Sequence, residues 1–506
     1  MLQINNFSIT LIKDDKTLIK DLTFSLNKND KLGLIGEEGN GKSLLLKAIV
    51  DEDLISDFCK LEGSINKEGE LLGYLPQSHD EEILKLSPKA YLMKELSDNF
   101  DYNAYYKNLR FFDLDDYLYE ERLTLKDLSG GERIKFTLLT QILKNPSLLL
   151  LDEPSNDLDM DAVLWLENFI RDIDLPVIFI SHDQKLLSAC ANRIIHLELT
   201  HRRQIARHTV FSGGYEAYME YRKSFIENES KRALSDKKDF KEKVDNYHRI
   251  YHSVNSALRG TKNDIEGKNL KDKMHTVKSM GKRLEKEKEN LRKAPELEDP
   301  IAIDFDESIS IAKSKTVLDL KLPLLRAGDK DLAYDIDLKV FGAEKVCIIG
   351  PNGSGKTSLI KKIVEVLKDS DLRLGYMPQN YFDLEDFDLT ALSYLSRSPS
   401  KDEHTKISTY LGSLNFTRDD MYKKIKDLSG GQKAKLYFAK MNLDKAEVLV
   451  LDEPTRNLSP TSQNELMDAL MKYNGPIISA SHDRAFIERL GEIIYKLDGK
   501  KLVREK

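Results

Sequence analysis

The chain has 506 residues, of which 40% are hydrophobic and 32% are charged, a composition typical of a globular protein with two or three domains. The net charge of −7 does not by itself indicate a nucleic-acid partner, and three cysteines without paired spacing argue against a disulfide scaffold. The sequence contains no apolar run long enough to span a membrane and no N-terminal signal peptide, so we expect a cytoplasmic protein.

Short apolar runs alternate with longer helical stretches in both halves of the chain. The runs are Leu32–Gly36, Leu148–Asp152 and Val177–Ser181 in the first half, and Val346–Gly350, Val448–Asp452 and Ile477–Ser481 in the second. Continuous apolar runs of this length are typical of parallel strands that are buried on both faces. The pattern therefore predicts an α/β fold, with ligands bound at the carboxyl ends of the strands.

Five motifs that suit phosphate chemistry follow these runs, and the whole set occurs twice in the same order. The first copy comprises Gly36, Glu37, Glu38, Gly39, Asn40, Gly41, Lys42, Ser43, Gln77, Ser129, Gly130, Gly131, Asp152, Glu153 and His182. The second comprises Gly350, Pro351, Asn352, Gly353, Ser354, Gly355, Lys356, Thr357, Gln379, Ser429, Gly430, Gly431, Asp452, Glu453 and His482. Such an internal repeat predicts two similar domains, each able to hold a nucleotide.

Each glycine loop provides the groups that bind phosphates and a metal ion. Glycines allow backbone N–H groups to surround phosphates at a helix N-terminus. Lys42 and Lys356 are expected to reach the β- and γ-phosphates. The expected Mg²⁺ ligands, some of them through water, are Ser43, Gln77, Asp152, Thr357, Gln379 and Asp452.

Four further side chains are candidates for the hydrolytic step. Glu153 and Glu453 follow the metal-binding aspartates, where a carboxylate can accept a proton from the attacking water. His182 and His482 lie 30 residues beyond those aspartates and can donate a hydrogen bond to the γ-phosphate. We therefore expect these four side chains to be catalytic.

The Leu-Ser-Gly-Gly element, followed by Glu132 or Gln432, resembles the signature of the ATP-binding cassette superfamily. The resemblance implies an ATPase that converts ATP and water to ADP and phosphate, with ATP and Mg²⁺ as cofactors. It also implies a monomer whose two cassettes pair head to tail. Ser129, Gly130 and Gly131 would then contact the nucleotide held by Lys356, and Ser429, Gly430 and Gly431 the nucleotide held by Lys42.

Two cassettes joined by a charged linker, with no membrane domain, resemble the ABC-F class. We expect residues 1–211 and 300–506 to form the cassettes and residues 212–299 to form the linker. Two apolar seams predict an antiparallel helical hairpin: Phe240, Val244, Tyr247, Tyr251, Val254 and Leu258, and then Leu270, Met274, Val277, Leu284 and Leu291. Gly260 and Gly267 are expected to break the helix and to place the tip at about residues 258–270.

The linker is basic although the whole chain is acidic. Between Ile226 and Lys293 there are 19 Lys or Arg residues against 12 Asp or Glu residues, a pattern that favours binding to a phosphate backbone. The ABC-F resemblance implies binding at the tRNA exit site of the bacterial 70S ribosome, with the linker near 23S rRNA, the P-site tRNA and the peptidyl transferase centre. Candidate contacts are Arg259, Lys262, Lys268 and Lys271. A solvated coiled coil that only joins two domains is the alternative.

Two details favour one subgroup of the class. The interval between glutamine and signature is 51 residues in the first cassette and 49 in the second, which leaves no room for an inserted arm. The segment Thr455–Pro460 replaces the usual Leu-Asp ending, seen at Leu158-Asp159, and resembles the Vga and Lsa type of antibiotic-resistance protein. That resemblance implies ribosome protection against lincosamides, streptogramin A and pleuromutilins.

The alternatives are a housekeeping translation factor of the same class and the ATPase subunit of a membrane transporter. One departure from the family pattern concerns the first glycine loop, where Glu37 and Glu38 place two acids. Their charge is expected to weaken nucleotide binding unless their side chains turn outward.

Overall fold

The computed structural model describes the chain except residues 97–99, 118–122, 157, 201–203, 261–263, 290–304, 306–308, 310, 329, 380–387, 399, 415, 457 and 506. Within the last helix before residue 290, the side chains of residues 264–267 and 289 are also outside the description. The expectations for Lys262, Leu291, Asn457 and the boundary between residues 299 and 300 therefore lie outside the described residues. The chain divides into two compact units, Met1–Tyr215 with Glu298–Lys506, and Glu216–Leu297.

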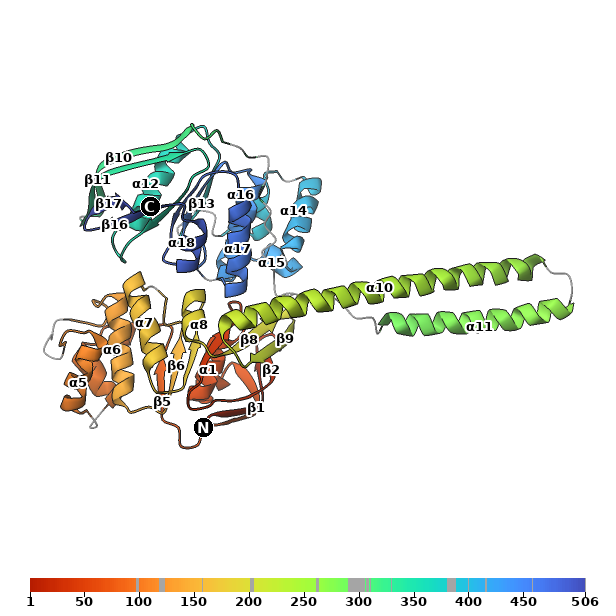
Figure 1. Ribbon diagram of the computed structural model, residues 1–506, viewed down its shortest axis with the longest axis horizontal. Helices are drawn as coiled ribbons and strands as arrows, with labels where there is room; N and C mark the ends of the chain where they lie inside the picture. Colours follow the sequence, from red (N-terminus) through yellow and green to blue (C-terminus); the bar gives the residue numbers. More distant parts are fainter. Residues whose placement is uncertain are drawn as a thin grey trace. The chain divides into compact units, whose positions relative to one another are not determined.

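Each half of the first unit contains a six-stranded sheet (Figure 1). The first sheet has the order β5 (Leu72–Leu75), β6 (Leu148–Asp152), β7 (Val177–Ile180), β3 (Lys31–Ile35), β8 (Arg193–Leu199) and β9 (Ile205–Phe211). The second has the order β13 (Leu374–Met377), β14 (Val448–Asp452), β15 (Ile477–Ala480), β12 (Lys345–Ile349), β16 (Ile493–Asp498) and β17 (Lys501–Arg504). In both sheets five strands are parallel and the last edge strand is antiparallel. The α/β fold with two repeated sheets is confirmed.

Smaller antiparallel sheets accompany the main sheets. In the first cassette they are β2 (Lys16–Ser25), β1 (Gln3–Leu11) and β4 (Cys59–Asn66), in that order. In the second cassette β10 (Thr316–Ala327) pairs with β11 (Lys330–Phe341). The alternating burial of β11 shows that one of its faces packs on the core and the other faces solvent.

Helices connect the strands of both sheets. Those of the first cassette are α1 (Lys42–Val50), α2 (Asp53–Ser56), α3 (Glu81–Leu84), α4 (Pro88–Leu96), α5 (Tyr102–Phe112), α6 (Gly130–Leu143), α7 (Met160–Asp172) and α8 (Gln184–Cys190). Those of the second are α12 (Lys356–Lys368), α13 (Ala391–Leu395), α14 (Lys401–Ser413), α15 (Arg418–Tyr422), the 3₁₀ helix η3 (Ile425–Asp427), α16 (Gly430–Leu443), α17 (Pro460–Lys472) and α18 (Arg484–Leu490). α6 and α16 begin in the same way, because Ser129 and Ser429 each close a capping box with the residue three positions later.

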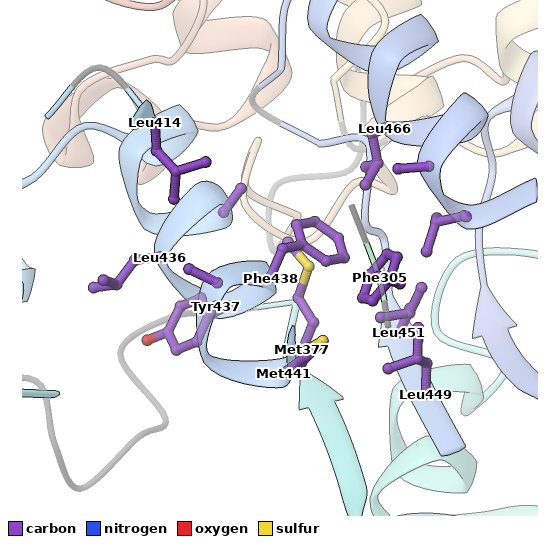
Figure 2. Close-up of a cluster of buried hydrophobic side chains, with 14 of the residues drawn as sticks. Phe305, Met377, Leu414, Leu436, Tyr437, Phe438, Met441, Leu449, Leu451 and Leu466 are labelled. Carbon is purple, nitrogen blue, oxygen red and sulfur yellow. The ribbon is translucent and has the colours of Figure 1, made fainter. Parts of the chain in front are cut away.

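Phe305 anchors the beginning of the second cassette in its core (Figure 2). Its ring lies 5.1 Å from that of Tyr473 and 6.4 Å from that of Phe438, centroid to centroid. Leu449 and Leu451 of β14 belong to the same buried cluster. This packing holds strand β14 in the core. Its C-terminal Asp452 therefore has a fixed position at the carboxyl edge of the sheet, where ligands bind in folds of this kind.

The second unit is a helical hairpin made by α10 (Tyr215–Gly260) and α11 (Asp264–Glu289), which lie side by side in Figure 1. Lys243 pairs with Glu287, and a Cβ atom at Gly281 would lie 2.8 Å from the hydroxyl of Tyr247, so the helices pack antiparallel. The expected break at Gly260 coincides with the end of α10, but the expected break at Gly267 is wrong because α11 passes through it. A glycine inside a helix costs only about 1 kcal/mol, which packing along a helix can offset.

Candidate nucleotide site

Both glycine loops adopt a backbone that only glycine tolerates at their first position. Gly36 has a φ of 147° and Gly350 a φ of 152°. A Cβ atom would lie 2.3 Å from the carbonyl oxygen of Leu197 in the first cassette and 2.3 Å from that of Leu497 in the second. The loop therefore passes against the neighbouring strand with no space for a side chain, and this close approach fixes its path.

Each loop leads into a helix whose N-terminal amides have no side-chain cap. Gly41 and Gly355 precede α1 and α12 in left-handed conformations, and neither helix start has a hydrogen bond from a capping side chain. Uncapped N–H groups at a helix start, beside a buried lysine, bind phosphate well. This donor set fits the phosphates of a nucleotide.

The two loop lysines lie in the same position in both cassettes. The ammonium group of Lys42 donates to the carbonyl oxygens of Gly36 and Glu37 at 2.7 and 2.9 Å. Lys356 donates to those of Gly350 and Pro351 at 2.8 Å each. Burial lowers the pKa of Lys356 below its ordinary value. Each ammonium group is thus held by two carbonyl oxygens of its own glycine loop.

Most of the metal ligands expected from the sequence lie beside one another at the carboxyl ends of β6 and β14, whereas Gln77 donates to Glu153. Ser43 donates to Asp152 at 2.9 Å, whereas Thr357 donates to Gln379 at 3.1 Å. Burial raises the pKa of Asp152 and of Asp452 to about 6. Among the described residues, Asp452 Oδ2 is buried without a hydrogen-bond partner, an arrangement that fits a carboxylate oxygen able to bind Mg²⁺ directly or through water.

The two candidate catalytic glutamates share a strained backbone. Glu153 and Glu453 both have a φ of 50°, in the left-handed region that side chains other than glycine rarely adopt. Each carboxylate faces the histidine expected beside it, at 3.4 Å for His182 and 3.6 Å for His482. The structure therefore brings each expected glutamate and histidine together.

The surroundings of the two glutamates differ. Burial alone would raise the pKa of Glu153, but the hydrogen bond and charge interaction with His182, together with Lys42 and Asn156, lower it to about 2. Gln77 also donates to Glu153, at 2.9 Å. Burial and the neighbouring Asp452 instead raise the pKa of Glu453 to about 8. At neutral pH Glu153 is therefore ionised, whereas Glu453 is largely protonated.

The two signature elements also differ in what they contact. The Gly430 amide of the second signature donates to Glu38 of the first glycine loop at 2.6 Å, so the structure places that signature beside the loop of Lys42. Within the described residues, no hydrogen bond joins Ser129–Gly131 to the loop of Lys356. The two signatures therefore differ in their hydrogen bonds to the opposite glycine loop, and the contacts expected with a bound nucleotide stay a prediction.

A cavity of about 290 Å³ lies where the candidate catalytic groups of both cassettes meet. Its lining from the first cassette includes Glu153, Asn156 and His182, and its lining from the second includes Asn352, Gly353, Glu453 and His482. His182 also contacts the second cassette, since its Nδ1 atom lies 2.7 Å from the carbonyl oxygen of Leu458. Both candidate proton acceptors line this cavity.

Sequence reasoning missed residues that join the two cassettes. Arg484 pairs with Glu167 at 2.8 Å and with Asp183 at 3.6 Å. Gln184, at the matching position of the first cassette, donates to Gln463 at 3.1 Å. The sequence did contain a sign of these contacts, because positions 184 and 484 directly follow the repeated His-Asp pair and differ between the two copies.

Two parallel sheets, each with a glycine loop, a buried acidic strand end and a capped signature helix, define a tandem P-loop ATPase. A family model described as "ABC transporter" matches residues 19–156 and 333–456, more than half of the chain. The chain belongs to this family and carries two ABC ATPase domains. None of the helices in the described part of the chain is both long enough and apolar enough to cross a membrane.

Known proteins resemble the chain along nearly all of its length. "ABC transporter F family member 2" of Arabidopsis thaliana is 28% identical over 96% of this chain and 75% of its own length. "Ribosome protection protein VmlR" of Bacillus subtilis (strain 168) is 28% identical over 94% of this chain and 83% of its own. A solved complex of an archaeal ribosomal stalk protein with the ribosome recycling factor aABCE1 has a TM-score of 0.56 at 18% identity, covering 97% of this chain and 87% of that one. This last likeness concerns the fold alone.

Proposed function

We propose that the chain is an ABC-F ATPase that binds the ribosome through the hairpin of α10 and α11 and uses ATP to control that binding. One observation carries the proposal. A single polypeptide contains two complete glycine-loop sites and a continuous 46-residue helix, which forms one arm of a basic hairpin. That helix is on the order of 70 Å long. Similarity to proteins named as F family members and as a ribosome protection protein supports the class.

The roles of the site residues follow from their positions. Bound Mg²⁺ would neutralise phosphate charge, held by Ser43 and Asp152 in one site and by Thr357, Asp452 and Gln379 in the other. The loop amides and the lysine ammonium groups would orient the phosphates.

The acid–base step would fall to the strained glutamates. Glu153 and Glu453 would accept the proton of the attacking water, since each carboxylate lies at the end of a strand and faces a histidine. Glu453, with its pKa of about 8, would do so only after losing its own proton. His182 and His482 would hold those carboxylates in position and hydrogen-bond the γ-phosphate.

The hairpin provides the surface for RNA. Arg259, Lys268 and Lys271 are exposed near its tip. The apolar seam accounts for packing between the two helices, with Val277 and Leu284 buried, but it does not account for the surplus of cations. Exposed cations on a long helical hairpin suit contact with phosphate groups of ribosomal RNA and of tRNA in the P site.

Within this class we propose protection of the bacterial ribosome against lincosamides, streptogramin A and pleuromutilins. The Thr455–Pro460 segment and the similarity to VmlR support this finer function. A housekeeping translation factor is the second candidate, because the plant F family member has the same 28% identity over a slightly larger share of the chain. Expression in a susceptible bacterium separates the two: protection raises drug tolerance without lowering intracellular drug, and a housekeeping factor leaves tolerance unchanged. Reduced drug accumulation would instead indicate a transporter subunit.

Ribosome binding is tested by co-sedimentation with 70S ribosomes over a range of salt concentrations. Neutralising Arg259, Lys268 and Lys271 together to Gln should weaken binding and reduce the slope of log K against log salt by about 3, if each contacts one phosphate. Neutralising Lys60, Lys321 and Lys339 on strands of the cassettes, three exposed cations as well, is the matched control and should leave the slope unchanged. An equal slope for both triple variants would show that the hairpin tip does not bind RNA.

A further inference from the structure

The two glycine loops differ in charge at two adjacent positions. Glu37 and Glu38 of the first loop correspond to Pro351 and Asn352 of the second. The sequence predicts that this charge weakens nucleotide binding unless the side chains turn outward. The structure shows where both carboxylates go: each contacts the second cassette.

Glu37 lies in a buried contact with the beginning of α17. Its side chain is only 8% exposed and accepts hydrogen bonds from the hydroxyl groups of Ser459, at 2.6 Å, and Ser462. Burial alone would raise the pKa of Glu37, but nearby Lys435, these two hydroxyls and Lys42 together lower it below its ordinary value. Glu37 is therefore an ionised carboxylate whose hydrogen-bond donors belong to the other cassette.

Glu38 lies at the signature of the second cassette. Its Oε2 atom accepts from the amide of Gly430, at the N-terminus of the 14-residue helix α16, at 2.6 Å. Lys433 of the same helix has its pKa lowered by burial, and the charge of Glu38 opposes that shift, which places the two charges near each other. The Gly430 amide is one of the groups expected at the γ-phosphate of a nucleotide on Lys42. One N–H group cannot serve a carboxylate and a phosphate fully at the same time.

The second cassette differs from the first at the positions that receive Glu37. Ser459 and Ser462 correspond to Asp159 and Ala162 of the first cassette. An aspartate at position 459 would place a second negative charge beside buried Glu37, and an alanine at 462 would remove one hydroxyl donor. The sequence differences between the two cassettes on each side of this contact thus complement each other: the acidic loop faces hydroxyl donors where the other cassette has an aspartate and an alanine.

We propose that Glu37 and Glu38 form an anionic latch that fastens the first glycine loop to the second signature and competes there with the γ-phosphate. The inference rests on the proposed nucleotide binding and adds the order in which the two sites fill. The latch makes the Lys42 site the weaker one, since nucleotide must displace Glu38 from Gly430. In the glycine loop of Lys356 the corresponding residues are Pro351 and Asn352, so no loop carboxylate competes with the nucleotide there and this site fills first. In the nucleotide-free protein the latch holds the two cassettes together.

The test measures each site separately with a fluorescent N-methylanthraniloyl derivative of ATP, in the presence of Mg²⁺ and with the full chain. The Lys356→Ala background reports the first site, and the Lys42→Ala background reports the second. In the Lys356→Ala background, Glu38→Asn, which installs the residue of the second loop, should lower the Kd at least about tenfold. Glu68→Asn removes a charge from an exposed turn of the same cassette and is the matched control, with the Kd unchanged.

A second variant tests the buried half of the latch. Glu37→Gln should lower the first-site Kd by a smaller factor, because a glutamine oxygen still accepts from the hydroxyls but carries no charge. The latch is overturned if both sites bind the analogue while Glu38→Asn behaves like Glu68→Asn. If neither background nor the unaltered chain binds the analogue, the proposed nucleotide binding itself fails and the latch with it.

Discussion

Arg484 forms a charged link between the cassettes, and we expect its loss to destabilise the first unit. Its guanidinium group lies 2.8 Å from Glu167 and 3.6 Å from Asp183, and all three side chains are about one-sixth exposed. Changing Arg484 to Gln, the residue at the matching position of the first cassette, leaves both carboxylates without their cation.

The magnitude follows from burial. Removing one partner of a buried ion pair costs 3–5 kcal/mol in the free energy of unfolding, and the residual exposure here favours the lower end, about 3 kcal/mol. With an m-value of about 3 kcal/mol per molar urea, the midpoint should fall by about 1 M. Glu167→Gln in the same chain should recover part of this loss, because one uncompensated carboxylate is then removed.

The assay uses the single tryptophan of the chain. Trp165 stacks on Phe169 at 5.3 Å and lies in α7, the helix that carries Glu167, so its fluorescence reports the unfolding of that helix. Arg489→Gln on the same helix as Arg484 is the control, since its partner Asp468 is largely exposed and the midpoint should stay within about 0.2 M. A midpoint unchanged by Arg484→Gln, or a double variant whose losses simply add, would refute the reasoning.

Two further changes test the site itself. Glu153→Gln together with Glu453→Gln should abolish phosphate release while nucleotide stays bound, because Gln fits the site but does not accept a proton; hydrolysis at the unaltered rate would remove both glutamates from the proposed role. Gly36→Ala should lower the stability by at least about 2 kcal/mol and weaken nucleotide binding, because its Cβ atom would lie 2.3 Å from the Leu197 carbonyl oxygen; Gly260→Ala, where a Cβ atom meets nothing within 4 Å, should show neither effect in thermal melting and nucleotide titration.

The fold was predictable from the sequence because its strands are continuous apolar runs that end in chemically distinctive residues. The break expected at Gly267 was wrong because a sequence pattern does not show how strongly the partner helix holds α11. The contact of Glu37 with Ser459 joins residues 422 positions apart, and no spacing rule predicts it. The sequence showed two unusual features, an acidic glycine loop and a changed segment after Asp452, but only the structure shows that they touch.

The left-handed backbone at Glu153 and Glu453 sets the stability of the chain against the presence of a carboxylate at these two positions. A glutamate in that conformation costs on the order of 1 kcal/mol, and glycine would adopt it without penalty. The most durable version of each turn is therefore one that lacks the carboxylate. The chain accepts this loss of stability at matching positions of its two halves, and under the proposed function the result is a carboxylate beside the attacking water in each site. A chain selected only for thermal stability would therefore be expected to acquire glycine at both positions and to lose both proposed proton acceptors.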